Sequence, residues 1–135
     1  MGSQPRNWHI YFLKDCPYVK PRPKDKLAVI VLNEGDWWGF LINSEIDAWI
    51  RIDPAKRAAQ VPISCSEHLC LKRDSFVDCL DLYRYEDFLL SQIRDPVSEA
   101  AKALILEAVK TSTTISRKHK RLILKESKAQ KRRAR

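Results

Sequence analysis

Five or six short apolar runs precede the first long helical pattern in this 135-residue chain, and turn-forming residues separate them. The expected strands are residues 8–13, 27–32, 37–42, 60–63 and 76–83, with 48–52 as a further short strand. The continuous apolar run at 27–32 predicts a strand buried on both faces. A parallel α/β sheet would need helices between the strands, and no helical pattern occurs there. The order predicts a mainly β (α+β) fold, a small bent β-barrel closed by a C-terminal helix.

The closing helix is predicted to begin at Asp95 and Pro96. An aspartate can cap free backbone amides, and proline fits the first helical position. Apolar residues then recur at helical spacing, which predicts packing on the sheet; they are Val97, Ala100, Ala101, Leu104 and Ala108. The Ser/Thr-rich residues 111–114 weaken the pattern, and residues 85–90 predict a short helical turn.

Positive charge is concentrated at the C-terminus. Residues 117–135 hold ten Lys/Arg and one Glu, a net charge of +9, while residues 1–116 carry 15 basic and 16 acidic groups. This contrast predicts a nearly neutral domain over 1–116 and a basic tail over 117–135, flexible or helical on binding. Such a tail can bind a polyanion through electrostatic attraction. The alternative is a solvated end without a function of its own.

The composition also excludes several classes of protein. No apolar run approaches the ~20 residues that span a bilayer, and the first residues lack the apolar core of a signal peptide. A cytoplasmic protein without membrane contact is expected. With only three glycines, at positions 2, 35 and 39, no glycine-rich phosphate loop is present, so ATP or dinucleotide binding is not expected.

Two of the four cysteines, Cys65 and Cys70, flank His68 and suggest a metal site. Structural zinc sites pair one such knuckle with a second, and the sequence offers no second pair. Small buried thiols are the favoured alternative in a cytoplasmic chain, so no metal ligand is expected.

Three stretches carry a resemblance to a known family. The letters LKRDSFVDCLDLY at residues 71–83 are similar to the family's "GLKKDSVV" followed by a strand, and FLINSE at 40–45 is similar to its strand ending "I-T-S". With the run at 27–32, these stretches resemble the MazF/PemK-like toxins of bacterial toxin–antitoxin pairs, over about residues 8–109. The resemblance implies an SH3-like barrel of the CcdB/MazF type.

The resemblance also implies an activity, which is cleavage of single-stranded RNA without metal or other cofactor. It further implies a homodimer and an antitoxin bound over the loop at residues 14–26. Inhibition of gyrase, as in the CcdB branch, has no residue here that supports it. A barrel without catalysis, which binds nucleic acid or protein through the basic tail, remains the alternative function.

The catalytic residues that the resemblance implies are Ser44, Lys26 and Arg22. Ser44, or Asn43 beside it, matches the hydroxyl that helps to activate the ribose 2′-oxygen. The family usually has Arg-Pro directly before the second strand, whereas this chain has Lys26-Leu27 there and Arg22-Pro23 four residues earlier. A lysine neutralises phosphate charge without the planar fork of arginine.

Further residues are predicted to contact nucleic acid. Trp37, at a turn before a strand, could stack on an unpaired base or pack in the core. His68 could donate a proton or be an exposed loop residue. The remaining candidates are Lys20, Lys24, Asn43, Lys72 and Arg73.

Overall fold

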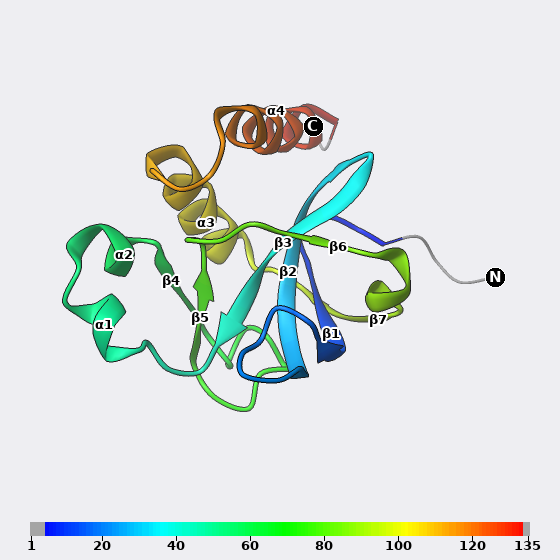
Figure 1. The fold of residues 1–135 in the computed structure, drawn as a ribbon. Coiled ribbons are helices and arrows are strands. Elements are labelled where there is room, and N and C mark those ends of the chain that lie inside the picture. Colours follow the sequence, from blue (N-terminus) through cyan, green and yellow to red (C-terminus); the bar gives the residue numbers. More distant parts are fainter. Residues whose placement is uncertain (1–4, 134–135) are drawn as a thin grey trace.

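The computed structural model describes residues 5–133, in which one curled antiparallel sheet is covered by two C-terminal helices (Figure 1). The strands are β1 His9–Cys16, β2 Lys24–Glu34, β3 Asp36–Asn43, β4 Gln60–Ile63, β5 Ser75–Asp78, β6 Tyr83–Tyr85 and β7 Gln92–Pro96. The helices are α1 Ala48–Arg51, α2 Pro54–Ala58, the 3₁₀ turn η1 Asp87–Leu90, α3 Glu99–Thr111 and α4 Arg117–Arg133.

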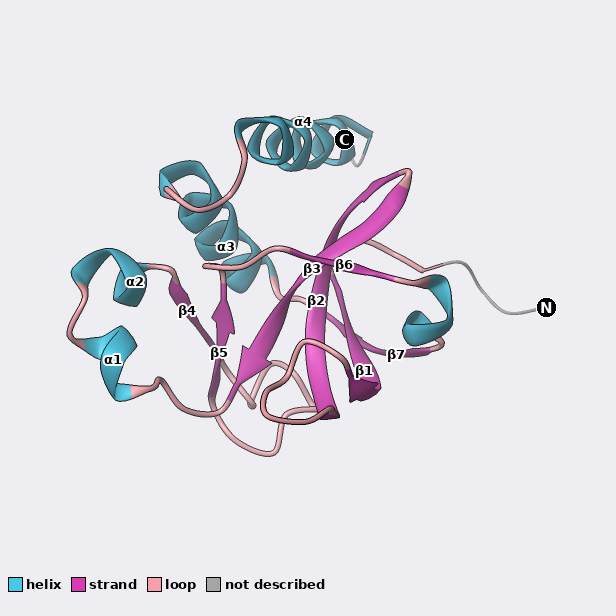
Figure 2. Cartoon of the chain, viewed as in Figure 1, coloured by secondary structure: helices cyan, strands magenta, loops and turns pink. Residues whose placement is uncertain are grey.

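The sheet order is β4-β5-β3-β2-β1-β7, and β6 pairs with the first half of β3 (Figure 2). β5 instead pairs with the end of β3 at Ile42 and Asn43, so β3 bends between two partners. The sheet curls into a half-barrel with α3 along its open side. The predicted fold class, a small bent β-barrel with a C-terminal helix, is confirmed.

The long hairpin of β2 and β3 is the centre of the sheet. Gly35 turns the chain with a φ of +73°, which a glycine adopts without steric cost. Gly39 lets the two strands approach, because a Cβ there would collide with the Val29 carbonyl oxygen. Substitution of Gly39 would therefore force β2 and β3 apart.

The sheet separates two apolar clusters. One contains Ile10, Val29 and Val31 and continues under α3 and α4, whereas the other contains Tyr11, Ala28 and Ile30 on the opposite face. All residues from 28 to 32 are buried, so the expectation of a strand covered on both faces is confirmed.

Two predicted strands differ in the structure. Residues 48–52 form α1 instead, followed by α2, in which Asp53 accepts hydrogen bonds from the Ala55 and Lys56 amides and Pro54 takes the first position. The predicted strand at 76–83 is interrupted because the Asp78 carboxylate accepts the Leu80 amide at 3.1 Å, a local turn that ends β5.

The closing helix begins later than predicted. Asp95 and Pro96 end β7, and the Asp95 carboxylate accepts the Cys70 amide at 2.8 Å. The N-cap is Ser98, whose hydroxyl accepts the Ala101 amide at 3.1 Å. The buried face comprises Ala101, Ile105, Ala108 and Val109, whereas Leu104, predicted on that face, is 49% exposed. The helix ends at Thr111, where the Ser/Thr run begins.

Residues 117–133 form one continuous helix, α4, which lies against α3 and β2. Ile123 is 0% exposed and belongs to the first apolar cluster, so the helix is held by packing. No helix in the described range 5–133 is long and apolar enough to cross a membrane. The last two residues of the predicted tail, 134 and 135, lie outside the described part.

Candidate functional site

Two grooves meet at Lys26 and Ser44, at the end of the sheet where β2 begins and β3 ends. The larger groove has a volume of about 550 Å³ and the smaller about 460 Å³. Besides Lys26 and Ser44, the polar residues of the larger groove are Tyr18, Lys20, Lys24, Asn43, Glu45, Asp47, Gln60, Asp78, Asp81 and Tyr83. Those of the smaller groove are Asp25, Lys72, Arg73, Ser75 and Arg94.

Lys26 is a half-buried cation placed by strand register. Leu27 pairs with Ile42, which brings the preceding residue of β2 beside Asn43, and the Lys26 Nζ donates to Asn43 Oδ1 at 2.5 Å. Burial lowers the pKa of Lys26 below the ordinary 10.5, and the charge of Lys24 lowers it further. The carboxylates of Asp78 and Asp47 act in the opposite direction. The site therefore holds a desolvated ammonium that is compensated by nearby acids.

Ser44 follows the last residue of β3, and its side chain is exposed at the junction of both grooves. A hydroxyl both donates and accepts hydrogen bonds, so it can orient a ribose hydroxyl that lies across the junction. The structure thus brings together Lys26 and Ser44, two of the three catalytic candidates. The third, Arg22, is exposed on the loop and lines neither groove.

A pair of carboxylates in the larger groove was not predicted as site residues. Asp78 accepts the Gln60 side-chain amide at 2.9 Å as well as the Leu80 amide. Desolvation, with a contribution from the charge of Asp78, raises the pKa of Asp81 above the ordinary 3.8. Asp81 can therefore accept or donate a proton closer to neutral pH than an ordinary aspartate. The sequence signal was two carboxylates three residues apart after a strand.

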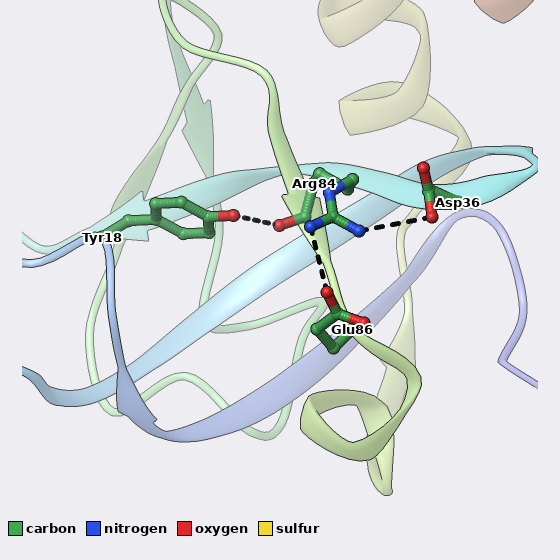
Figure 3. Close-up of polar contacts among 4 residues, drawn as sticks. All are labelled: Tyr18, Asp36, Arg84 and Glu86. Atoms are coloured by element: carbon green, nitrogen blue, oxygen red, sulfur yellow. Dashed lines mark hydrogen bonds and ion pairs between the residues drawn. The ribbon is translucent and has the colours of Figure 1, made fainter.

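An aromatic stack fixes the loop that carries Lys20 beside the groove. The Tyr18 ring stacks on Tyr83 with centroids 4.3 Å apart and meets the edge of Tyr85 at 5.7 Å. The Tyr18 hydroxyl donates to the Arg84 carbonyl, and the Arg84 guanidinium pairs with Asp36 at 3.4 Å and Glu86 at 3.0 Å (Figure 3). β6 thus anchors the loop to the sheet.

The smaller groove is basic, and Lys72 and Arg73, which were predicted to contact nucleic acid, both line it and are exposed. Arg94 of β7 is an additional cation that sequence patterns did not single out. Its guanidinium lies 5.5 Å from the centre of the Phe12 ring and donates to the Gln92 side chain at 3.2 Å. The register of β7 against β1 brings this cation to the groove.

His68 was predicted as a proton donor or an exposed loop residue, and this is wrong because its side chain is only 1% exposed. Nε2 accepts the Ser98 amide at 2.9 Å, which leaves Nδ1 as the protonated nitrogen that donates to the Ser64 carbonyl at 2.7 Å. His68 lines neither groove and instead ties its loop to the start of α3.

Trp37 also lies outside both grooves. It is half-buried against the second apolar cluster and pairs with Tyr85, the packing alternative that the sequence left open. Trp49 of α1 is 55% exposed and lines the larger groove, with the Lys56 Nζ 4.6 Å from its ring centre. Residues 48–52 were predicted as a strand. The exposed position of Trp49 in the groove follows from the helix α1 that forms there instead.

Cys65 and Cys70 are held in hydrogen bonds with carboxylates. A hydrogen bond to Asp74 raises the pKa of Cys65, and burial followed by a hydrogen bond to Asp95 raises that of Cys70. Metal ligation needs the thiolate, which these environments disfavour. Within residues 5–133, no three His, Cys, Asp or Glu side chains are grouped so as to hold a metal ion.

The comparisons with known proteins show that this chain is similar in fold to a solved structure. No family model and no curated protein matches the sequence. Among solved structures, the chain is similar to the Mycobacterium tuberculosis toxin MazF-mt6, with a TM-score of 0.54 and 14% identity. The match covers 74% of this chain and 90% of that one. The half-barrel with its C-terminal helix is therefore a MazF-like fold.

Proposed function

We propose that this protein is a toxin-like endoribonuclease that cleaves single-stranded RNA at the junction of the two grooves, without a metal ion. The observation that carries the proposal is that Lys26 and Ser44 line both grooves of a MazF-like fold. A strand of RNA that follows both grooves would pass over these two residues. Lysines along the larger groove, and lysines and arginines along the smaller one, would hold its phosphates.

The proposed reaction is an attack of the ribose 2′-oxygen on the adjacent phosphorus. Asp81 accepts the 2′-proton, and the Ser44 hydroxyl orients the attacking group. Lys26 neutralises the charge that develops on the non-bridging oxygens. The 5′-oxygen of the next nucleotide leaves with a proton from water, which gives a 2′,3′-cyclic phosphate and a 5′-hydroxyl.

The first test is incubation of the protein with a long single-stranded RNA in EDTA. Wild type should cut the RNA, and Ser44→Ala should cut it about 10²-fold more slowly, at the lower end of the losses typical of a general acid–base group. Ser91→Ala, an exposed serine outside both grooves, is the matched control and should cut like wild type. Full activity of Ser44→Ala would remove the serine from the mechanism.

The pH profile of cleavage is expected to be bell-shaped. Asp81 must be ionised, and its pKa is raised, so the rate rises with pH through an acid limb above 3.8. Lys26 must be protonated, and its pKa is lowered, so the rate falls through an alkaline limb below 10.5. Lys26→Arg should move the alkaline limb to higher pH because a guanidinium stays charged. Single-turnover rates between pH 4 and pH 10 measure both limbs, and a limb unmoved in Lys26→Arg would contradict the assignment.

Trp49 is proposed to stack on a base next to the cleaved phosphate. Stacking contributes about 1–3 kcal/mol per base, so Trp49→Ala should weaken single-stranded RNA binding by about 5- to 150-fold, and Trp49→Phe by less. Trp49 is the most exposed of the four tryptophans, and quenching of its fluorescence by RNA should disappear in Trp49→Phe. Trp37→Phe is the control. Equal affinity of Trp49→Ala and wild type would rule out the stack.

The proposed partners follow from the family resemblance and from the structural neighbour, which is a toxin. We propose a homodimer and an acidic antitoxin that covers the loop around Lys20 and thereby blocks the larger groove. A second function, RNA binding without cleavage, is favoured by one observation. Lys26 donates to Asn43 in place of the arginine that the family usually carries.

A further inference from the structure

The two sides of α4 differ in chemistry. Ile123 is fully buried, and Leu122 and Leu124 pack against the same apolar cluster. His119 lies over Trp38 of β3, with ring centroids 4.3 Å apart, and the Lys120 Nζ donates to the Lys110 carbonyl of α3 at 3.2 Å. One side of the helix therefore packs against the barrel.

The opposite side is an exposed basic stripe made of Arg117, Arg121, Lys125 and Lys128. At 100° per residue these four side chains lie within about 80° of one another, on the side of the helix away from Ile123. The ion pairs found among the described residues involve Arg84 and none of the four. Lys118 is exposed beside the stripe and adds to its charge.

The stripe's chemistry favours the phosphates of a nucleic acid. Phosphate contacts need cations alone, whereas a stable protein interface is centred on buried aromatic or apolar anchors, which the stripe lacks. An amphipathic helix that lies on a membrane inserts its apolar face, but that face of α4 is packed on the barrel.

α4 crosses beyond the far end of the β2–β3 hairpin (Figure 1), whereas both grooves are lined by Lys26 near the start of β2. Trp38, which contacts α4, pairs with Leu32 near the end of β2, whereas Lys26 lies near its beginning. Leu32 follows Lys26 by six residues along the strand, a span of about 20 Å. Most of the stripe is therefore remote from Lys26. Its N-terminal end lies nearer the larger groove, because Thr114, three residues before Arg117, donates to the carbonyl of Leu80, which lines that groove.

We propose that the basic stripe of α4 is a second RNA-binding surface, which holds the backbone of a long single-stranded RNA outside the grooves. This inference rests on the proposed function for the identity of the nucleic acid. It assigns long RNA as the preferred substrate, since only an RNA that extends well beyond the grooves can contact the whole stripe.

The test replaces Arg117, Arg121, Lys125 and Lys128 together by glutamine, which leaves the packed face of α4 intact. The probes are a long single-stranded RNA and a trinucleotide, both 2′-O-methylated so that neither is cut. The variant should lose at least tenfold in affinity for the long RNA at low salt. The slope of log K against log salt should become less negative by about 3, at about 0.7 per phosphate contact. Affinity for the trinucleotide, which spans only about 10 Å, should stay unchanged.

The control replaces Arg6, Lys14, Arg51 and Arg57, four exposed cations away from α4 and outside both grooves, by glutamine. This change lowers the net charge equally, so an equal loss of affinity in the control would overturn the proposal. An unchanged salt slope in the α4 variant would overturn it as well, and loss of polyglutamate binding alone would assign the stripe to an acidic protein. Because both probes are uncleavable, a protein that binds long RNA through α4 but never cuts RNA would refute the proposed function alone.

Discussion

Lys26→Ala is expected to reduce the rate of RNA cleavage by about 10²–10³-fold, the usual cost of removing one group that stabilises developing negative charge. The lysine is half-buried in a groove wall, where its charge acts with little screening by water. Single-turnover cleavage at pH 7, with RNA at saturating protein, measures the loss. The affinity for RNA should fall much less than the cleavage rate, since other cations line both grooves.

Two variants make this result specific to Lys26. Lys24→Ala removes an exposed neighbouring cation from the same strand and should reduce binding more than the rate of the bound complex. Arg22→Ala removes the arginine of the displaced Arg-Pro pair, which lines neither groove, and should leave the rate unchanged. Loss of cleavage in Arg22→Ala with full activity in Lys26→Ala would transfer the catalytic role to the loop arginine.

His68→Ala is expected to lower the free energy of unfolding by about 2–5 kcal/mol. The substitution leaves the buried Ser98 amide and the Ser64 carbonyl without their partners, at the N-terminus of α3. Denaturant unfolding followed by circular dichroism gives the change. His68→Gln should recover part of the loss, because its amide can accept from Ser98 and donate to Ser64.

The neighbouring Leu69 supplies the control for this prediction. Its side chain is 86% exposed, so Leu69→Ala should alter the free energy of unfolding by less than about 0.5 kcal/mol. Stability of His68→Ala within that same range would mean that the imidazole does not hold the loop to α3. The histidine would then be free for a role in binding.

Local patterns predicted the fold better than they predicted the site. The apolar run of β2, the turn at Gly35 and the strand at residues 60–63 depend on nearest neighbours along the chain, and the structure contains all three. α1 was predicted as a strand because Trp49 and Ile50 favour strands, but residues 48–51 form a helix that does not join the sheet.

The site residues that sequence patterns missed depend on contacts between distant segments. Asp81 gains its raised pKa from burial in the folded groove, and Arg94 reaches the smaller groove through the pairing of β7 with β1. The prediction for His68 was wrong for a related reason, since its partner Ser98 is thirty residues away. The shared place of Lys26 and Ser44 at the junction of the grooves could be predicted, because the family resemblance compares the ends of neighbouring strands.

The most direct measurement of the central claim is the chemistry of the RNA ends after incubation with wild-type protein in EDTA. The proposed reaction predicts new fragments that end in a 2′,3′-cyclic phosphate and begin with a 5′-hydroxyl, and their yield should fall in Lys26→Ala and Ser44→Ala. Intact RNA that is nevertheless retarded by the protein on a gel would contradict the account and identify the barrel as a binding module.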